Sequence, residues 1–148
     1  MKKTFLFIVL LIVGLFSVNA QDIPDNAIGI RFGDNNGFGG EISYQKRLND
    51  NNRLEIDLGI RKGNAFKAIG LYQWVWVLEN QFNWYAGAGG GIASASGSTA
   101  IVGAGVVGIE YNFDIPLVIS LDYRPEIGFT GFYDGFQSDF GLGLRYQF

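Results

Sequence analysis

Apolar and polar residues alternate with a period of two along most of the chain after residue 20. In the segment RLEIDLGIR, Leu54, Ile56, Leu58 and Ile60 share one face, and charged residues and a glycine occupy the other. This period is that of a β-strand, whose successive side chains point to opposite faces. Turn-forming stretches such as DNNG, NDNN, ENQ and SGS interrupt it at intervals of about a dozen residues. The pattern predicts eight strands and no helix, at 26–34, 38–48, 53–63, 66–78, 82–94, 99–112, 116–130 and 136–148.

The apolar face of these strands has the features of a surface that contacts lipid. It is large and aromatic on nearly every strand, and its few charges, Lys46 and Lys62, lie near strand ends, where lysine can reach a membrane interface. An even number of strands permits closure, which removes the unpaired edges that lipid does not tolerate. The sequence therefore predicts an all-β, eight-stranded antiparallel up-and-down transmembrane β-barrel. Five residues form a predicted aromatic girdle at a membrane–water boundary: Tyr72, Trp74, Trp76, Trp84 and Tyr111.

The first 20 residues have the three parts of a secretory signal peptide. Lys2 and Lys3 are followed by the apolar run FLFIVLLIVGLF and by the small residues of VNA. A retained membrane anchor is the alternative, but the run is shorter than the ~20 apolar residues of a spanning helix. We expect a signal peptide at 1–20, cleaved after Ala20, and a single barrel domain at 21–148.

Composition excludes several functions. Without Lys2 and Lys3, the 11 basic and 14 acidic residues become nine and 14, a net charge of −5, which argues against a nucleic-acid partner. The chain has no cysteine and no histidine. Disulfides and a lipid-modified cysteine are therefore excluded, and good ligands for zinc and other transition metals are missing. We expect no metal and no cofactor.

The polar face of the first three and last two strands carries balanced charge. Strands from the two ends of the chain are neighbours only if the barrel closes, so this match is an independent indication of closure. Arginine suits such a core because its rigid fork of donors pairs with carboxylates. The predicted lumen charge network comprises six arginines and six acids: Arg31, Glu41, Arg47, Arg53, Glu55, Asp57, Arg61, Asp122, Arg124, Glu126, Asp139 and Arg145.

The inner face of the middle strands is small and apolar instead. Gln73, Tyr85 and Glu110 are its main polar members. One interpretation is a cavity for an acyl chain or small ligand beside a glycine wall. The other, which we favour, is that glycine makes room for long arginines and for Tyr85 in a narrow lumen. The remaining inward positions are Leu71, Val75, Gly87, Gly89, Gly91, Val102, Ala104 and Val106.

The signal peptide, eight alternating strands, aromatic belts and an ending of Leu144, Tyr146 and Phe148 resemble the small eight-stranded outer-membrane barrels, which include outer-membrane proteins A and X. The resemblance implies location in a bacterial outer membrane, with outer-membrane lipid as surroundings. It also implies that periplasmic chaperones and the barrel assembly machinery read the last strand, whose assembly signal would be Leu144, Tyr146 and Phe148. With both termini in the periplasm, DNNG, GNA, SGS and FYDG become external loops, and NDNN, ENQ and FDIP become periplasmic turns.

Two further features bear on activity. Pro125 has no N–H for the strand ladder and predicts a bulge or a local gap, which could admit lipid sideways. Outer-membrane enzymes of this resemblance use histidine as a general base, and this chain has none. We therefore expect no enzyme, but an integral outer-membrane barrel with a filled, charge-paired lumen and a structural or interaction role. The alternatives are a lipid- or small-ligand-binding barrel and, more distantly, a soluble lipocalin-like carrier.

Overall fold

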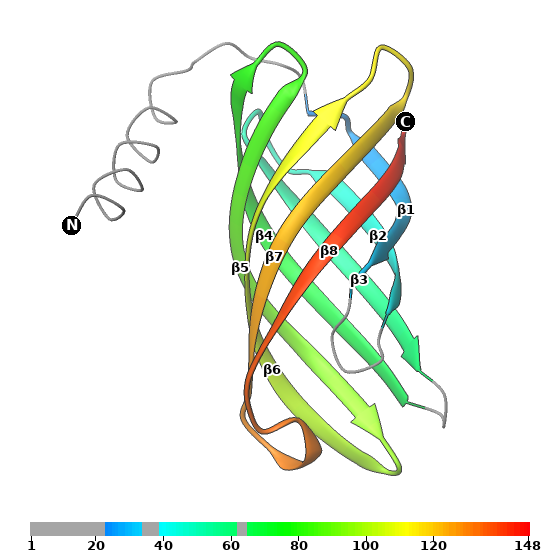
Figure 1. Cartoon of the computed structure of the whole chain (residues 1–148), viewed down its shortest axis with the longest axis vertical. Coiled ribbons are helices and arrows are strands. Elements are labelled where there is room, and N and C mark those ends of the chain that lie inside the picture. The colour runs from blue at the N-terminus through cyan, green and yellow to red at the C-terminus, as the bar shows by residue number, and fades with distance from the viewer. Residues whose placement is uncertain (1–22, 34–38, 62–64) are drawn as a thin grey trace, which may run out of the picture.

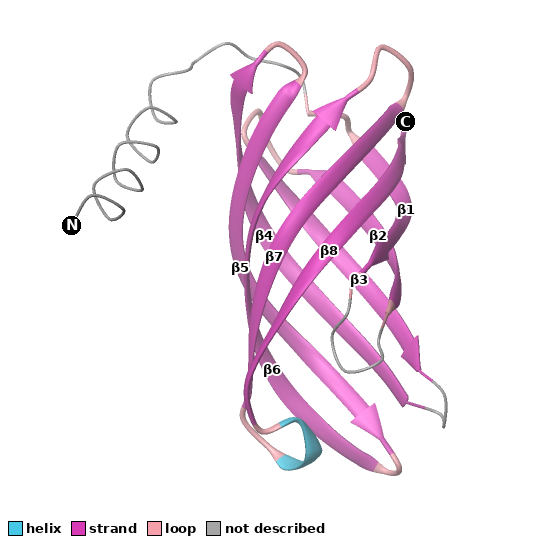
Figure 2. Ribbon diagram, viewed as in Figure 1, coloured by secondary structure: helices cyan, strands magenta, loops and turns pink. Residues whose placement is uncertain are grey.

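The computed structural model describes residues 23–33, 39–61 and 65–148, of which Arg61 is described by its backbone alone. Eight antiparallel strands form a closed barrel in which each strand pairs with its sequence neighbours and β8 pairs with β1 (Figure 1). One short 3-10 helix, η2, is the only helix in the described part, and Figure 2 shows it within the β7–β8 connection. The elements are β1 (Asn26–Phe32), β2 (Gly40–Arg47), β3 (Asn52–Arg61), β4 (Ala65–Glu79), β5 (Phe82–Ala95), β6 (Ser98–Asn112), β7 (Leu117–Gly128), η2 (Gly131–Tyr133) and β8 (Gly135–Gln147).

The predicted fold class, an all-β up-and-down barrel of eight strands, is confirmed. Each observed strand begins and ends within two residues of its predicted limits. The largest differences, of two residues, are at the ends of β1, β3 and β7 and at the start of β2. After Gly128 the chain leaves the sheet because it turns into η2, whose first residue, Gly131, has a positive φ of 64°. The predicted signal peptide, residues 1–20, and the predicted DNNG loop, residues 34–37, lie outside the described residues.

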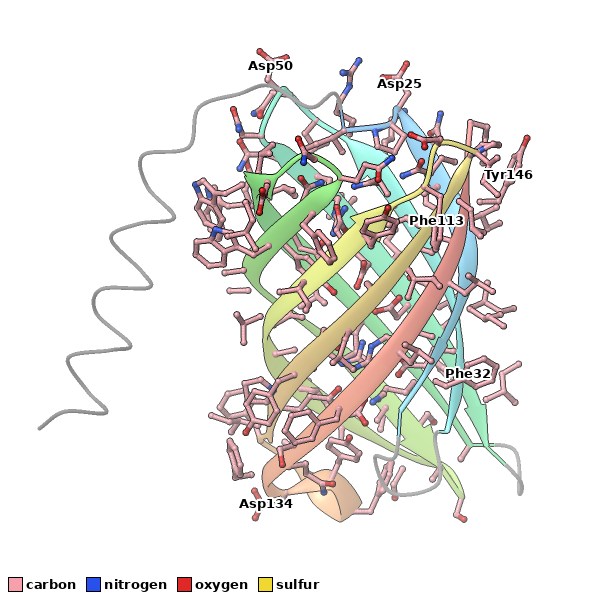
Figure 3. All side chains as sticks on the ribbon, turned by 45° about the horizontal axis from the view of Figure 1, so that its top comes forward. Asp25, Phe32, Asp50, Phe113, Asp134 and Tyr146 are labelled. Atoms are coloured by element: carbon pink, nitrogen blue, oxygen red, sulfur yellow. The ribbon has the colours of Figure 1, made fainter. Side chains whose placement is uncertain are left out.

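The two ends of the barrel differ in what they carry. One end, here called the terminal rim, carries Asp25, Phe148 and the turns β2–β3, β4–β5 and β6–β7; it is uppermost in Figure 1. The other, the opposite rim, carries the β5–β6 turn and the β7–β8 connection. Figure 3 accordingly shows Asp25 and Asp50 at one end and Asp134 at the other. The predicted grouping of turns by barrel end is therefore correct for the described turns.

The barrel closes where the first strand meets the last. In the middle of this seam Ile30 pairs with Leu144, and the pairing runs from Ala27↔Gln147 to Phe32↔Leu142. At the terminal rim the Asn26 N–H donates to the Phe148 carbonyl at 3.0 Å, and the Phe148 N–H donates to the Asn26 carbonyl at 2.9 Å. Phe148 is thus held by backbone hydrogen bonds, as expected for a final strand that completes a barrel.

Pro125 produces a gap in one ladder without a bulge. Between β6 and β7 the pairs stop at Ala104↔Glu126 and resume at Val107↔Tyr123, and the register is the same on both sides. On its other side Pro125 stays in register with Ser138 of β8. The proline therefore removes pairing toward β6 alone, because it lacks the N–H that the ladder would use. No helix in the described part of the chain is long and apolar enough to cross a membrane.

Candidate functional site

The barrel buries its charges and exposes its apolar side chains. Twelve charged residues are buried in the described chain, and large apolar side chains on every strand are exposed. The alternation of each strand produces this division, since odd and even positions face opposite sides of the wall. Figure 3 shows Phe32 and Tyr146 pointing away from the barrel. The inward charges form the candidate site: Arg31, Glu41, Arg53, Glu55, Asp57, Lys67, Glu110, Asp122, Arg124, Glu126, Asp139 and Arg145.

Arg31 of β1 binds acids from three other strands. Its Nη2 lies 2.5 Å from Asp122 Oδ1 of β7, and its Nη1 lies 2.5 Å from Asp139 Oδ2 of β8. The same Nη1 is 3.3 Å from Glu41 Oε2 of β2. Arginine can hold three carboxylates because its five N–H groups point in different directions within one plane. These ion pairs connect β1 to its two neighbours, β2 and β8, and to β7, which lies beyond β8.

Arg124 of β7 is a second centre, nearer the opposite rim. Its Nη2 is 2.5 Å from Glu41 Oε1, its Nη1 is 2.8 Å from Asp57 Oδ2, and its Nε is 3.0 Å from Glu126 Oε1. Lys67 of β4 reaches the same Glu126 at 3.0 Å. These contacts cross the lumen from β7 to β2, β3 and β4, so the interior is bridged by side chains.

The third group lies toward the terminal rim. Arg145 Nη2 is 3.2 Å from Glu55 Oε2, and the Arg145 Nε and Nη1 donate to Ser43 Oγ and Ser120 Oγ at 2.9 and 2.8 Å. Arg53 pairs with Glu110 at 2.8 Å.

Tyr85 stands between the charged and apolar parts of the lumen. The Arg53 guanidinium lies 4.8 Å from its ring centroid, in a cation–π contact. Its hydroxyl donates to Asp122 Oδ2 at 3.2 Å. A side chain from β5 therefore joins the Arg31 group to the Arg53 pair.

Arg47 and Lys67 differ from the sequence-based expectation for the network, and the prediction for Arg61 is not tested. Arg47 lies at the terminal rim, where it pairs with the exposed Asp25 at 2.5 Å, and its side chain keeps 31% of its surface exposed. The side chain of Arg61 lies outside the described residues. Lys67 is fully enclosed although the prediction did not include it. It lies two residues before Ile69 and four before Leu71, so the strand period alone would have placed it inward.

The β4–β6 side of the lumen carries mostly apolar side chains, as predicted. Ile69, Leu71, Val75, Val102 and Val106 pack with Tyr85 in one cluster of buried residues. The same cluster includes a residue from each end of the barrel. Ile23, which precedes β1, enters from the terminal rim, and Tyr133 of η2 enters from the opposite rim, where its hydroxyl donates to Glu126 at 2.7 Å. Among the described residues, each end of the barrel thus contributes one side chain to the buried cluster.

The glycines of the lumen have two different roles. A Cβ at Gly108 would meet the Tyr85 ring and hydroxyl at 2.6 Å, and one at Gly143 would meet Arg145 Nη1 at 2.5 Å, so these glycines do make room for long side chains. Gly89 and Gly91 do not. A Cβ there would meet the β4 backbone, with Leu71 Cα and Ile69 Cα each 2.9 Å away. The expectation that Gly89 and Gly91 make room for arginine side chains and Tyr85 was wrong, because these glycines instead permit the close approach of β4 and β5.

Aromatic side chains gather on the outer wall toward both rims. Near the terminal rim, Tyr72 and Trp74 lie 5.0 Å apart, and Trp76 stacks on Trp84 at 4.3 Å. Tyr111 completes this group with Phe82 at 4.8 Å. The five residues of the predicted girdle therefore lie together. A second group near the opposite rim was not singled out from the sequence; it comprises Tyr123, Phe129, Phe132, Phe136 and Phe140.

The lumen offers no metal centre in the part of the chain that the structure describes. No group of three or more acidic residues there is arranged to hold an ion. Each of the arginines and lysines in the network instead contacts a carboxylate. The arrangement is a set of ion pairs, not a set of ligands.

Closure, the antiparallel neighbour-to-neighbour order and the apolar exterior define the class: this is a barrel with the fold of transmembrane β-barrels. No family model and no curated protein matches the sequence. Among solved structures, a designed barrel from "De novo design of transmembrane beta-barrels" is similar over 88% of this chain and 100% of its own, with a TM-score of 0.65 and 11% identity.

Two further structures are similar. Neisserial surface protein A (NspA) matches over 83% of this chain and 94% of its own, with a TM-score of 0.59 and 15% identity. The de novo designed TMB2.3 matches over 87% and 98%, with a TM-score of 0.60 and 14% identity. At these identities the similarity is one of fold. The resemblance to outer-membrane proteins A and X stays a prediction.

Proposed function

We propose that the chain is an integral outer-membrane β-barrel with a filled, charge-paired lumen and a structural or interaction role in the cell envelope. The observation that carries the proposal is the inverted distribution of side chains. Large apolar groups such as Ile60 and Phe140, 77% and 67% exposed, cover the outside, while five arginine and lysine side chains are buried inside. A soluble lipocalin-like carrier would have the opposite arrangement.

A bilayer satisfies both faces of this wall. Apolar side chains on the exterior are stabilised by lipid, and closure leaves no unpaired strand edge in the hydrocarbon. Strands β3 to β8 are 10 to 15 residues long, enough to cross a bilayer at a tilt. The two aromatic groups then lie at the two interfaces, where Trp and Tyr place a polar edge near water.

The outer membrane is the proposed location because the N-terminal pattern indicates export and the strand pattern suits that membrane. Leu144, Tyr146 and Phe148 project outward from β8 and its end, and each is 40% exposed or more. Before insertion these side chains would be accessible to periplasmic chaperones and to the barrel assembly machinery. The terminal rim would then face the periplasm.

The role we assign has no catalytic step and no cofactor. The carboxylates of the lumen contact arginine or lysine, and neither histidine nor cysteine is available as base or nucleophile. The alternative of a ligand-binding barrel would need space beside the β5 glycines. There Ile69, Leu71 and Tyr85 pack into the apolar cluster, which favours a filled interior.

A lipid-facing arginine tests the membrane assignment. Leu142 lies near the middle of β8, 52% exposed on the outer wall. Leu142→Arg should cost ~2–4 kcal/mol of folding free energy in bilayers, and less in thinner bilayers, because thinning brings residue 142 closer to water. The measurement is a denaturant titration of folding in vesicles of two acyl-chain lengths.

Ile115→Arg is the matched control. Ile115 is also exposed, at 61%, but lies in the β6–β7 turn at the terminal rim. Its substitution should cost only ~0–1 kcal/mol and should not depend on bilayer thickness. Equal penalties at the two positions, or a Leu142→Arg penalty that is the same in thick and thin bilayers, would overturn the membrane assignment.

A further inference from the structure

The buried charges that the structure describes in the lumen do not balance. Among the described residues, seven carboxylates and five cationic side chains are buried. The acids are Glu41, Glu55, Asp57, Glu110, Asp122, Glu126 and Asp139, and the cations are Arg31, Arg53, Lys67, Arg124 and Arg145. Buried charge without compensation is costly, because a low-dielectric interior does not replace the hydration of an ion. A buried carboxylate that lacks a donor for one of its oxygens is therefore a candidate for binding a proton.

Two of the acids are neighbours on one strand. Glu55 and Asp57 are two residues apart on β3, so both side chains point into the lumen, and each residue is only 1% exposed. Asp57 is only 1% exposed, yet its Oδ1 receives no hydrogen bond from any donor. Its Oδ2 shares Arg124 with Glu41 and Glu126. Two neighbouring buried carboxylates repel each other unless one of them holds a proton.

The charged and titratable groups around this pair come from five strands. Glu41 of β2, Arg124 of β7 and Arg145 of β8 act on Asp57, and Arg53 of β3 and Arg145 act on Glu55, with Tyr85 of β5 beside it. Three guanidinium groups thus face the pair, but each already contacts another carboxylate or hydroxyl. A metal ion is disfavoured because no acidic group of the described chain is arranged to bind one.

We propose that Glu55 and Asp57 share one proton in the folded barrel, so that the pair is a proton-binding site carrying a single negative charge. The proton sits on Asp57 Oδ1, and this O–H donates to a Glu55 oxygen. Glu55 is the acceptor because its Oε2 already receives the Gln45 Nε2–H at 2.5 Å and lies 3.2 Å from Arg145 Nη2. The proton comes from water during folding and returns to water on unfolding. The bound proton removes the repulsion between the two carboxylates.

The site makes the stability of the barrel depend on pH in a defined direction. The folded chain retains a proton that the unfolded chain has released at neutral and alkaline pH. Stability therefore falls as pH rises, because the folded state binds more protons than the unfolded state. This dependence goes beyond the proposed envelope role and requires only the folded lumen, so it holds in detergent micelles as well as in bilayers.

Infrared spectroscopy of the folded full-length barrel in micelles tests the proposal directly. Wild type at neutral pH should show the carbonyl-stretch band of a protonated carboxylic acid, shifted by deuterium exchange. Asp57→Asn and Glu55→Gln should each lose this band, because the remaining carboxylate is then left with its arginine. Asp122→Asn is the control and should keep it, since Asp122 is bound through two nitrogens of Arg31 and does not belong to the pair.

Unfolding in denaturant supplies the second measurement. The unfolding midpoint of wild type should fall between neutral and alkaline pH, and Asp57→Asn should show less of this fall, because its Nδ2–H donates to Glu55 at any pH. Absence of the band from wild type overturns the proposal whether or not the variants fold. A band that persists in both Asp57→Asn and Glu55→Gln also overturns it, as does stabilisation by added sodium or magnesium in the absence of a band.

Discussion

At the scale of single residues, the lumen depends on arginines that each hold several carboxylates. Arg31 and Arg124 are each almost fully buried, and each contacts at least three acids. A lysine in these positions would present a point charge in place of a planar fork and could not keep the same geometry. Lys67, by contrast, lies between Glu126 and Glu41, where a compact ammonium suffices.

Removal of one such arginine should destabilise the barrel strongly. Arg124→Met removes the cation that Asp57 shares with Glu41 and Glu126 and leaves Asp57 without an ion pair, so we expect a loss of ~3–5 kcal/mol in the free energy of unfolding. The measurement is a urea titration of the protein folded in bilayers.

Arg47→Met is the control for this substitution. Its ion pair with Asp25 is partly exposed at the terminal rim, and such pairs contribute ~0–1 kcal/mol. Similar losses for Arg47→Met and Arg124→Met would show that the ion pairs of the lumen are not better sequestered than those of the rim.

At the scale of elements, glycine determines how closely two strands approach. Gly89 of β5 lies opposite Leu71 of β4, and a Cβ at this glycine would run into the Gly70 carbonyl oxygen. Gly70 itself is different, since a Cβ there would meet nothing nearer than the Gly90 carbonyl oxygen at 3.9 Å. The close approach of the two strands therefore requires a glycine at position 89 but not at position 70.

These two glycines give a matched pair of variants. Gly89→Ala should reduce the free energy of unfolding by ~1–3 kcal/mol, because the added methyl group must displace the β4 backbone. Gly70→Ala should change it by no more than about 0.5 kcal/mol, as an ordinary substitution on an exposed surface does. Denaturant titrations of both variants under one set of lipid conditions provide the comparison. The close approach of β4 and β5 would be refuted by a tolerated Gly89→Ala.

At the scale of the whole molecule, the barrel is closed along its wall, because β8 pairs with β1. Eight strands enclose a space just wide enough for side chains to fill. Ion pairs cross one part of this space, and an apolar cluster that includes Ile23 and Tyr133 packs in another. The charged side chains therefore lie inside the barrel, and the exterior is apolar.

A filled interior should carry little current. Purified protein in planar bilayers should produce at most small and infrequent conductance steps, since ions cannot pass without displacing paired side chains. Addition of the same volume of detergent buffer is the control for leakage of the bilayer. Stable conductance of the size seen with porins would contradict the packed lumen.

The sequence by itself determined the strands and the side of the wall on which most residues lie. The reason is local: successive Cβ atoms of a strand alternate, so a period of two in Leu54, Ile56 and Leu58 specifies both the element and its outward face. Matched charges on the first and last strands also indicated closure. The alternation of side chains along the strand was enough to predict that Tyr72 and Trp74 lie together on the outer face.

The tertiary structure alone decided which charges meet. Arg31 pairs with Asp122 and Asp139 across 91 and 108 residues, a choice that depends on strand tilt and on the width of the lumen. It also placed Arg47 at the rim, because β2 ends there, and brought Tyr133 into the lumen through η2. The excess of buried carboxylates at Glu55 and Asp57 emerged in the same way. Charge balance is a property of the enclosed volume, and the enclosed volume exists only once the strands have closed.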